Sequence, residues 1–147
     1  MKIIYYDEKY LLPCAELLKK HYNTEEFGCK FDTLRASAYL QEHIFKPRFI
    51  GYLLLEKDEL IGFAFCHLRT WSDVDDLFID EFIIKDNHQN LGLGTKLLDF
   101  IDIYAQSLKL SGITTMTNII PLTNFYRKND FFEHDISFLY KGINPSE

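Results

Sequence analysis

The most informative pattern of hydrophobic and polar positions is an apolar run at 77–84, followed by a polar turn and a helical repeat. The run is short and rich in Phe and Ile, which is typical of a buried strand. Polar residues at 85–88 end the run, and a segment with two glycines follows. Beyond the glycines, apolar residues recur at helical spacing, at Leu97, Leu98, Ile101 and Tyr104 or Ala105. The pattern predicts a strand, a tight turn and an amphipathic helix.

The rest of the chain supplies elements on both sides of this unit. Before it, the pattern predicts a strand at 2–6, helices at 9–22 and about 33–45, strands at 49–56 and 60–71, and an acidic loop at 72–76. After it, the pattern predicts a strand at 113–119, a short helix from Pro121, and strands at 131–133 and 136–141. This order predicts an α/β fold in which helices cover a mixed sheet. With 147 residues we expect one domain, 1–147.

Composition narrows the functional class mainly by exclusion. A net charge of -6 argues against a nucleic-acid-binding protein. No apolar stretch approaches the ~18 residues of a membrane span, and the N-terminus lacks a signal segment. Three scattered cysteines do not form a disulfide framework, and five scattered histidines show no metal-ligand spacing. We therefore expect a cytoplasmic protein without a metal site.

The turn at 89–94 is the first candidate site. A helix start leaves backbone N–H groups unpaired and carries partial positive charge, so a phosphate fits there. Gly92 and Gly94 lack a Cβ, which allows a ligand to lie directly on the backbone. The spacing departs from the dinucleotide fingerprint, whose third glycine would stand at Leu97, and from the P-loop. The residues alone favour equally a phosphate-bearing cofactor held by main chain and a tight turn without a ligand.

Two motifs together resemble a known family. The run Gln89-Asn90-Leu91-Gly92-Leu93-Gly94 matches the signature Gln/Arg-x-x-Gly-x-Gly/Ala of the GNAT family of N-acetyltransferases. Downstream, Asn124-Phe125-Tyr126-Arg127-Lys128-Asn129-Asp130-Phe131 is similar to its Phe-Tyr-x-Lys-x-Gly-Phe run. Asp130 stands where the family usually has glycine, at a turn position expected to have positive φ. The chain resembles in particular the bacterial branch that includes aminoglycoside acetyltransferase-like members.

The resemblance implies a fold, a cofactor and a set of binding residues. The fold is a single-domain GNAT-like sheet, mostly antiparallel, with splayed central strands and helices on both faces. The cofactor is acetyl-CoA as acetyl donor, with its pantetheine arm between the splayed strands. Its pyrophosphate is expected on backbone N–H groups of Gln89, Asn90, Leu91, Gly92, Leu93, Gly94 and Thr95. Its pantetheine and acetyl carbonyl are expected on the main chain of Phe82, Ile83 and Ile84, where an N–H stabilises the oxyanion.

The same resemblance implies two catalytic side chains. Tyr126 is the candidate general acid, because a phenol with a reference pKa of about 10 donates to a departing thiolate. Its alternative is a packed aromatic residue. Glu81 is the candidate base, directly or through water, and its alternative is a salt-bridged acid, because unpaired burial is costly. Asp80 is the substitute base, and both acids face the same cleft only if a bulge reorients one of them. Asn118 and Asn124 fit the expected spacing of a cofactor-binding Asn poorly.

The predicted function is direct acetyl transfer from acetyl-CoA to a primary amine of a small molecule, aminoglycoside-like or a polyamine. One alternative is acetylation of a peptide or protein amine. A second, from another class, is an acyl-CoA-binding module without turnover. The expected partner is a small-molecule amine, with no nucleic acid and no membrane, and a homodimer is expected from the frequency of dimers among relatives.

Overall fold

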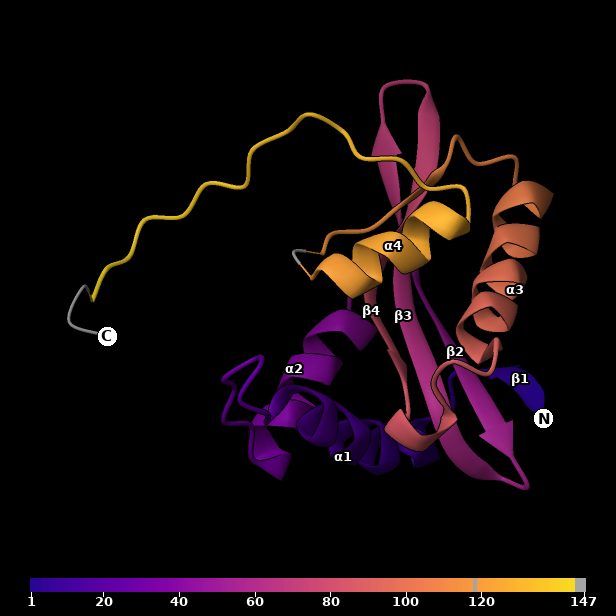
Figure 1. Cartoon of the computed structure of the whole chain (residues 1–147). Helices are drawn as coiled ribbons and strands as arrows, with labels where there is room; N and C mark the ends of the chain where they lie inside the picture. Colours follow the sequence, from indigo (N-terminus) through magenta and orange to yellow (C-terminus); the bar gives the residue numbers. More distant parts are fainter. Residues whose placement is uncertain (118, 145–147) are drawn as a thin grey trace. The chain divides into compact units, whose positions relative to one another are not determined.

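The computed structural model describes residues 1–117 and 119–144, coloured along the chain in Figure 1. Contacts divide the chain into two compact units, Met1–Met116 and Thr117–Glu147. The first unit holds the whole sheet, and the second holds one helix and the C-terminal segment.

The first unit is built on a five-stranded sheet whose spatial order follows the chain order. Its strands are β1 (Lys2–Tyr5), β2 (Phe49–Glu56), β3 (Glu59–Trp71), β4 (Val74–Ile84) and β5 (Ile113–Thr114). The first four strands pair antiparallel, and β4 pairs with β5 in parallel. A two-residue turn with positive φ at Lys57 and Asp58 joins β2 to β3, as the right-handed twist of hairpins favours. The predicted mixed, mostly antiparallel sheet is confirmed.

The chain also forms helices, and a side chain caps the start of some of them. The helices are η1 (Glu8–Tyr10), α1 (Leu11–Tyr22), α2 (Thr33–Ile44), η2 (Asp86–His88), α3 (Leu93–Ser107) and α4 (Ile120–Lys128). Asp32 caps α2, because its side chain accepts a 2.7 Å hydrogen bond from the backbone N–H of Arg35. Among the described residues, no helix has the length and apolarity needed to cross a membrane.

Alternation along β2 shows that the sheet is covered on both faces. Leu53 and Leu55 belong to the buried cluster that includes residues of α1 and α2. Tyr52 directly precedes Leu53 in sequence and therefore points to the opposite face. There its ring contacts Phe100 and Tyr104 of α3, at centroid distances of 5.7 and 6.3 Å. Figure 1 shows α1 and α2 on one side of the strands and α3 on the other, which confirms the predicted arrangement.

The hairpin of β3 and β4 is longer than predicted. Asp75 and Asp76 belong to β4, whereas the sequence placed them in an acidic loop. Asp76 lies opposite Arg69 in the ladder and binds its guanidinium through both oxygens, at 2.9 and 2.6 Å. Asp75 binds Arg48 at 2.6 Å. Opposite charges on neighbouring strands stabilise pairing, so the acidic residues extend the strand instead of ending it.

The strands predicted after β4 are where the sequence reading was wrong. β5 has two residues instead of seven, and the described segment 129–144 contains neither the strand predicted at 131–133 nor that at 136–141. A strand forms only when a neighbouring strand takes up its backbone hydrogen bonds. Apolar, aromatic-rich stretches therefore give a preference for strand, but they do not supply the partner.

Candidate active site

A β-bulge in β4 is the central feature of the site. Cys66 of β3 pairs with Ile79 and Phe65 pairs with Glu81, which leaves Asp80 as an extra residue on β4. A bulge of this kind places two consecutive side chains on one side of a strand. This is the condition under which the sequence allowed both acids to face one cleft.

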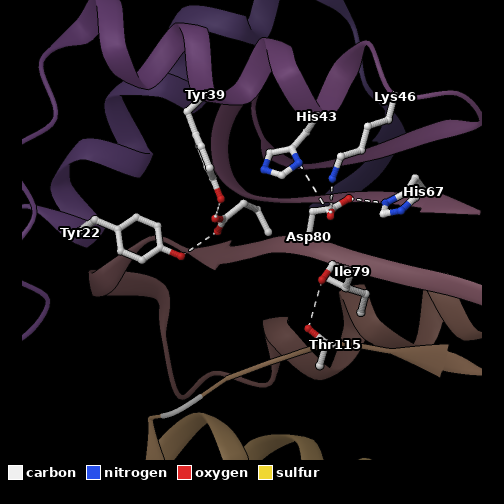
Figure 2. A network of polar contacts seen from close by, with 9 residues as sticks. Tyr22, Tyr39, His43, Lys46, His67, Ile79, Asp80 and Thr115 are labelled. Carbon is white, nitrogen blue, oxygen red and sulfur yellow. Dashed lines mark hydrogen bonds and ion pairs between the residues drawn. The ribbon is translucent and has the colours of Figure 1, made fainter. Parts of the chain in front are cut away.

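Both carboxylates do face the same layer of helices. Glu81 accepts a hydrogen bond from Tyr39 of α2, and Asp80 lies 2.8 Å from the ammonium of Lys46, just after α2. Figure 2 shows Tyr39, His43 and Lys46 lying on the same side of β4, with the side chain of Asp80 pointing toward them. The bulge thus brings two acidic groups to adjacent positions over the α2 side of the sheet.

Glu81 is a buried carboxyl group held by two phenols. Only 6% of Glu81 is exposed. One oxygen accepts from Tyr39, and the other accepts from Tyr22 of α1 at 2.8 Å (Figure 2). Burial raises the pKa of Glu81, the two phenol hydrogen bonds act to lower it, and the neighbouring Asp80 raises it further. Burial also raises the pKa of Tyr39, so this phenol stays protonated and remains a donor.

Asp80 is the centre of a second polar cluster. One of its oxygens binds Lys46, and the other lies 2.6 Å from Nδ1 of His67 on β3. Nδ1 of His43, on α2, is 3.8 Å from the carboxylate (Figure 2). Burial lowers the pKa of His43, so this ring is neutral at physiological pH. The buried carboxylate of Asp80 is therefore balanced by a lysine cation and hydrogen-bonded by a histidine.

Beyond the bulge, the backbone N–H and C=O groups of alternate β4 residues point toward β3. Lys85 N–H donates to the carbonyl of Ile61 on β3 at 2.8 Å, and Ile83 pairs with Phe63. Because backbone groups of successive strand residues point to opposite edges, those of Phe82 and Ile84 point to the β5 side. Pairing of β4 with β5 ends at Phe78. β4 continues beyond the end of its pairing with β5, as the predicted splay of the two central strands requires, and Phe82 and Ile84 lie in that part of the strand.

The turn after β4 is fixed by the side chain of Gln89. Its amide donates to the carbonyl of Ile84 at 2.9 Å and to the carboxylate of Asp86 at 3.1 Å. Asn90 and Gly92 have φ angles of +64° and +77°, so the chain passes through two left-handed residues before α3 begins. Gln89 therefore shapes the turn through its side chain, a role that the sequence reading missed.

The N-terminus of α3 is open in the way that a phosphate requires. Gly92 is its N-cap and provides no capping side chain, and the first turn contains no acidic residue. Nothing lies within 4 Å of the position that a Cβ on Gly92 would take. The first N–H groups of α3, at Leu93, Gly94 and Thr95, thus have neither a cap nor a negative side chain in front of them. This geometry fits the diphosphate of a coenzyme.

Tyr126 lies in the second unit, on α4. Its side chain is buried, with ring contacts of 5.2 Å to Phe125 and 5.2 Å to Phe131. Asp130 has a φ of +70°, which confirms the turn conformation predicted at this position. Asn124 lies on α4, and Asn118 lies outside the described residues. The role of Tyr126 toward the cofactor stays a prediction.

Sequence reasoning found the acids but missed most of the residues that bind them. Tyr39 and His43 are four residues apart on α2 and share a face with the buried Ala36 and Leu40. A polar pair on an apolar helix face is a signal for a buried polar site. His67, by contrast, is one polar residue in a strand, and its contact to Asp80 depends on the bulge.

Comparison with known proteins identifies the family. The sequence matches the acetyltransferase (GNAT) family over residues 14–131. No match is found among curated proteins. The fold is similar to an aminoglycoside 6'-N-acetyltransferase from Acinetobacter haemolyticus, with a TM-score of 0.75 and 14% identity over 98% of this chain and 100% of that one.

Two further solved structures share the fold and carry ligands. One is an aminoglycoside acetyltransferase from an uncultured soil metagenomic sample in complex with sisomicin, with a TM-score of 0.73 and 17% identity over 95% of each chain. The other is a predicted acetyltransferase from Clostridium acetobutylicum with acetyl-CoA, with a TM-score of 0.77 and 14% identity over 95% of each chain. The chain described here belongs to the GNAT family and is an N-acetyltransferase, with acetyl-CoA as the cofactor of that family.

We predict that the substitution Glu81→Gln increases the free energy of unfolding relative to wild type, and that this increase grows as pH rises. A carboxyl group with a raised pKa in the folded protein stabilises it fully below the unfolded value of 4.5, and this contribution is lost as pH rises through the folded value. Glutamine does not titrate, so the variant escapes this loss. The difference in free energy of unfolding should grow by at most about 1.4 kcal/mol per pH unit within that window.

Urea unfolding from pH 4.5 upward measures this difference. The matched control is Glu25→Gln, because Glu25 is exposed and its replacement should give a nearly constant difference from wild type. A constant difference for Glu81→Gln as well would show that folding leaves the Glu81 pKa unchanged.

Proposed function

We propose that this enzyme transfers the acetyl group of acetyl-CoA directly to a primary amine of a small molecule, and that residues 1–147 act as one N-acetyltransferase domain. The observation that carries the proposal is the construction of β4. The strand brings two carboxylates to its bulge, runs beside the end of the β5 pairing, and leads into the uncapped start of α3. Donor and acceptor would therefore meet along a single strand.

The donor is assigned to the main chain. Backbone N–H groups from Gln89 through Thr95 would hold the diphosphate, as the open N-terminus of α3 supports. The main chain of Phe82, Ile83 and Ile84 would align the pantetheine arm. Because the backbone of Ile83 is turned to β3, we assign the contacts to Phe82 and Ile84 first. The bound coenzyme supplies an acetyl group activated as a thioester.

Two side chains are proposed to move protons. Glu81 would accept a proton from the acceptor nitrogen, and its burial favours this role because it raises the pKa toward neutrality. Since both oxygens already accept phenol hydrogen bonds, the proton would reach Glu81 through a water or through the hydroxyl of Tyr22 or Tyr39. Tyr126 would donate a proton to the departing thiolate sulfur.

The class of the acceptor is proposed from the net charge of the chain and from the solved structures with a similar fold. Two structural neighbours are aminoglycoside acetyltransferases, and one of them is in complex with sisomicin. A net charge of -6 attracts a polycationic acceptor. A peptide or protein amine is the second candidate, and an acyl-CoA-binding module without turnover is the third.

The deciding experiment is a thiol-release assay with acetyl-CoA and a panel of aminoglycosides, polyamines, amino acids and short peptides. Release with aminoglycosides or polyamines is the expected result. Release with peptides alone would replace the small-molecule acceptor with a peptide acceptor. Tight binding of acetyl-CoA by calorimetry without release would favour the binding module, and neither binding nor release would overturn the proposed function.

We predict that Gly92→Glu abolishes binding of acetyl-CoA, whereas Gly92→Gln weakens it much less. Both side chains have the same size and meet the same strain at a φ of +77°. They differ in the carboxylate, which would compete with the diphosphate at the helix start. Calorimetry should show an affinity at least about tenfold lower for the glutamate variant, which corresponds to ~1.4 kcal/mol. Equal affinities would place the diphosphate elsewhere.

We predict that Tyr126→Phe lowers kcat by roughly 10²-fold and leaves the affinity for acetyl-CoA unchanged. The ring contacts that bury the side chain are kept, and only the acidic hydroxyl is lost. Tyr140→Phe is the control, because the Tyr140 side chain is exposed. Steady-state thiol release across pH measures the effect, and a kcat equal to wild type at every pH would exclude Tyr126 as the acid.

A further inference from the structure

His67 is held beside the bulge in an orientation that suits proton transfer. It lies on β3, opposite Phe78 of β4, and its Nδ1 is 2.6 Å from one oxygen of Asp80. The other oxygen of Asp80 is 2.8 Å from Nζ of Lys46. One carboxylate oxygen of Asp80 therefore contacts the imidazole of His67, and the other binds the ammonium of Lys46. The carboxylate thus fixes the orientation of the imidazole ring.

The contact to Asp80 leaves a basic nitrogen on His67. Because a carboxylate accepts at this distance, the neutral form of the ring has its proton on Nδ1 and its lone pair on Nε2. Nε2 makes no hydrogen bond to any residue in the described part of the chain, and 18% of the side chain is exposed. Glu81 differs on both points, since it is 6% exposed and both of its oxygens accept from phenols.

The reaction requires two proton acceptors. An alkylamine has a pKa of about 10, so it arrives as an ammonium ion and has no lone pair for attack. One proton must leave before the new C–N bond forms, and a second must leave the nitrogen afterwards. The thiol product retains one proton, and the other is released to solvent. The group that takes the first proton must therefore be basic near neutral pH and reachable from water.

We propose that His67, oriented by Asp80, removes the first proton from the ammonium of the acceptor, an inference that rests on the proposed function. The N–H bond of the ammonium breaks, the proton binds Nε2 of His67, and the neutral amine keeps the electron pair for attack. The imidazolium returns the proton to water before the next turnover. Glu81 then accepts the second proton from the nitrogen. Asp80 is a positioning residue that acts through His67.

The charges around the ring suit a proton that is taken up and released. Asp80 stabilises the imidazolium directly, and Asp76 on β4 adds a second negative charge that is itself bound by Arg69. Lys46 and His43 approach Asp80 from the α2 side. Lys46 thus places a positive charge beside the same carboxylate that contacts His67.

The test compares His67→Gln and Glu81→Gln with wild type across pH, using an amine accepted by the wild-type enzyme. For His67→Gln we expect kcat/KM to fall by roughly 10²-fold or more at pH 7. The loss should shrink about tenfold per pH unit as pH approaches the pKa of the free amine, because solution then supplies the neutral nucleophile. The loss in Glu81→Gln should persist at high pH. His134→Gln, an exposed histidine in the C-terminal segment, is the matched control.

Two further readouts separate a catalytic role from a structural one. Acetyl-CoA affinity should be unchanged in His67→Gln, whose amide can still donate to Asp80, and added imidazole should restore part of the activity of His67→Ala. Nitrogen-15 NMR of the wild type should show a His67 ring protonated at Nδ1, and Asp80→Asn should abolish that preference. If His67→Gln keeps the rate and pH profile of wild type, the inference is wrong and the proposed function stands. If wild type itself transfers no acetyl group to any amine, both fall.

Discussion

The single extra residue of β4 at Asp80 is the constraint on which the site depends. Without it, Asp80 and Glu81 would point to opposite faces of the sheet, one toward α2 and the other toward α3. With it, both carboxylates reach the α2 side. Beyond the bulge, the alternation that decides which residues direct their backbone N–H and C=O groups to β3 is also reversed. That reversal turns the backbone groups of Phe82 and Ile84 toward the β5 side and those of Ile83 toward β3. One inserted residue therefore sets both the acidic groups and the main chain that is proposed to face the donor.

Two buried carboxylates side by side are destabilising unless each has its own partners, and the structure provides two different solutions. Glu81 accepts hydrogen bonds from two phenols, which hold it in place without adding charge. Asp80 forms an ion pair with Lys46 and contacts the ring of His67. The two acids thus have different partners although they are adjacent, and in the proposed reaction Glu81 and His67, which Asp80 orients, take one proton each.

The parts of the structure that follow from local chemistry were predictable. The strand, turn and helix around Gly92 follow from periodicity and glycine placement, and Asp32 caps α2 as its residue type suggests. The residues that contact the two acids were not predictable from the sequence. Tyr22, Tyr39 and His67 come from three elements, and whether these elements meet depends on how the helices pack on the sheet. The terminal strands failed for a related reason, since apolar residues at 131–133 and 136–141 indicate strand preference and cannot specify a partner.

The proposed donor site consists of main-chain groups and the proposed acceptor site of side chains. This difference explains why the sequence predicts the donor site and does not predict the acceptor site. A diphosphate held by N–H groups needs only an open helix start and residues without Cβ, so Gly92 and Gly94 suffice to indicate it. The proposed acceptor side is formed by side chains of α1, α2 and β3 that converge on the bulge, each of a residue type that occurs throughout ordinary cores and surfaces. If the proposed site is correct, substitutions of Tyr22, Tyr39 or His67 should change which amine is bound and leave the donor site intact.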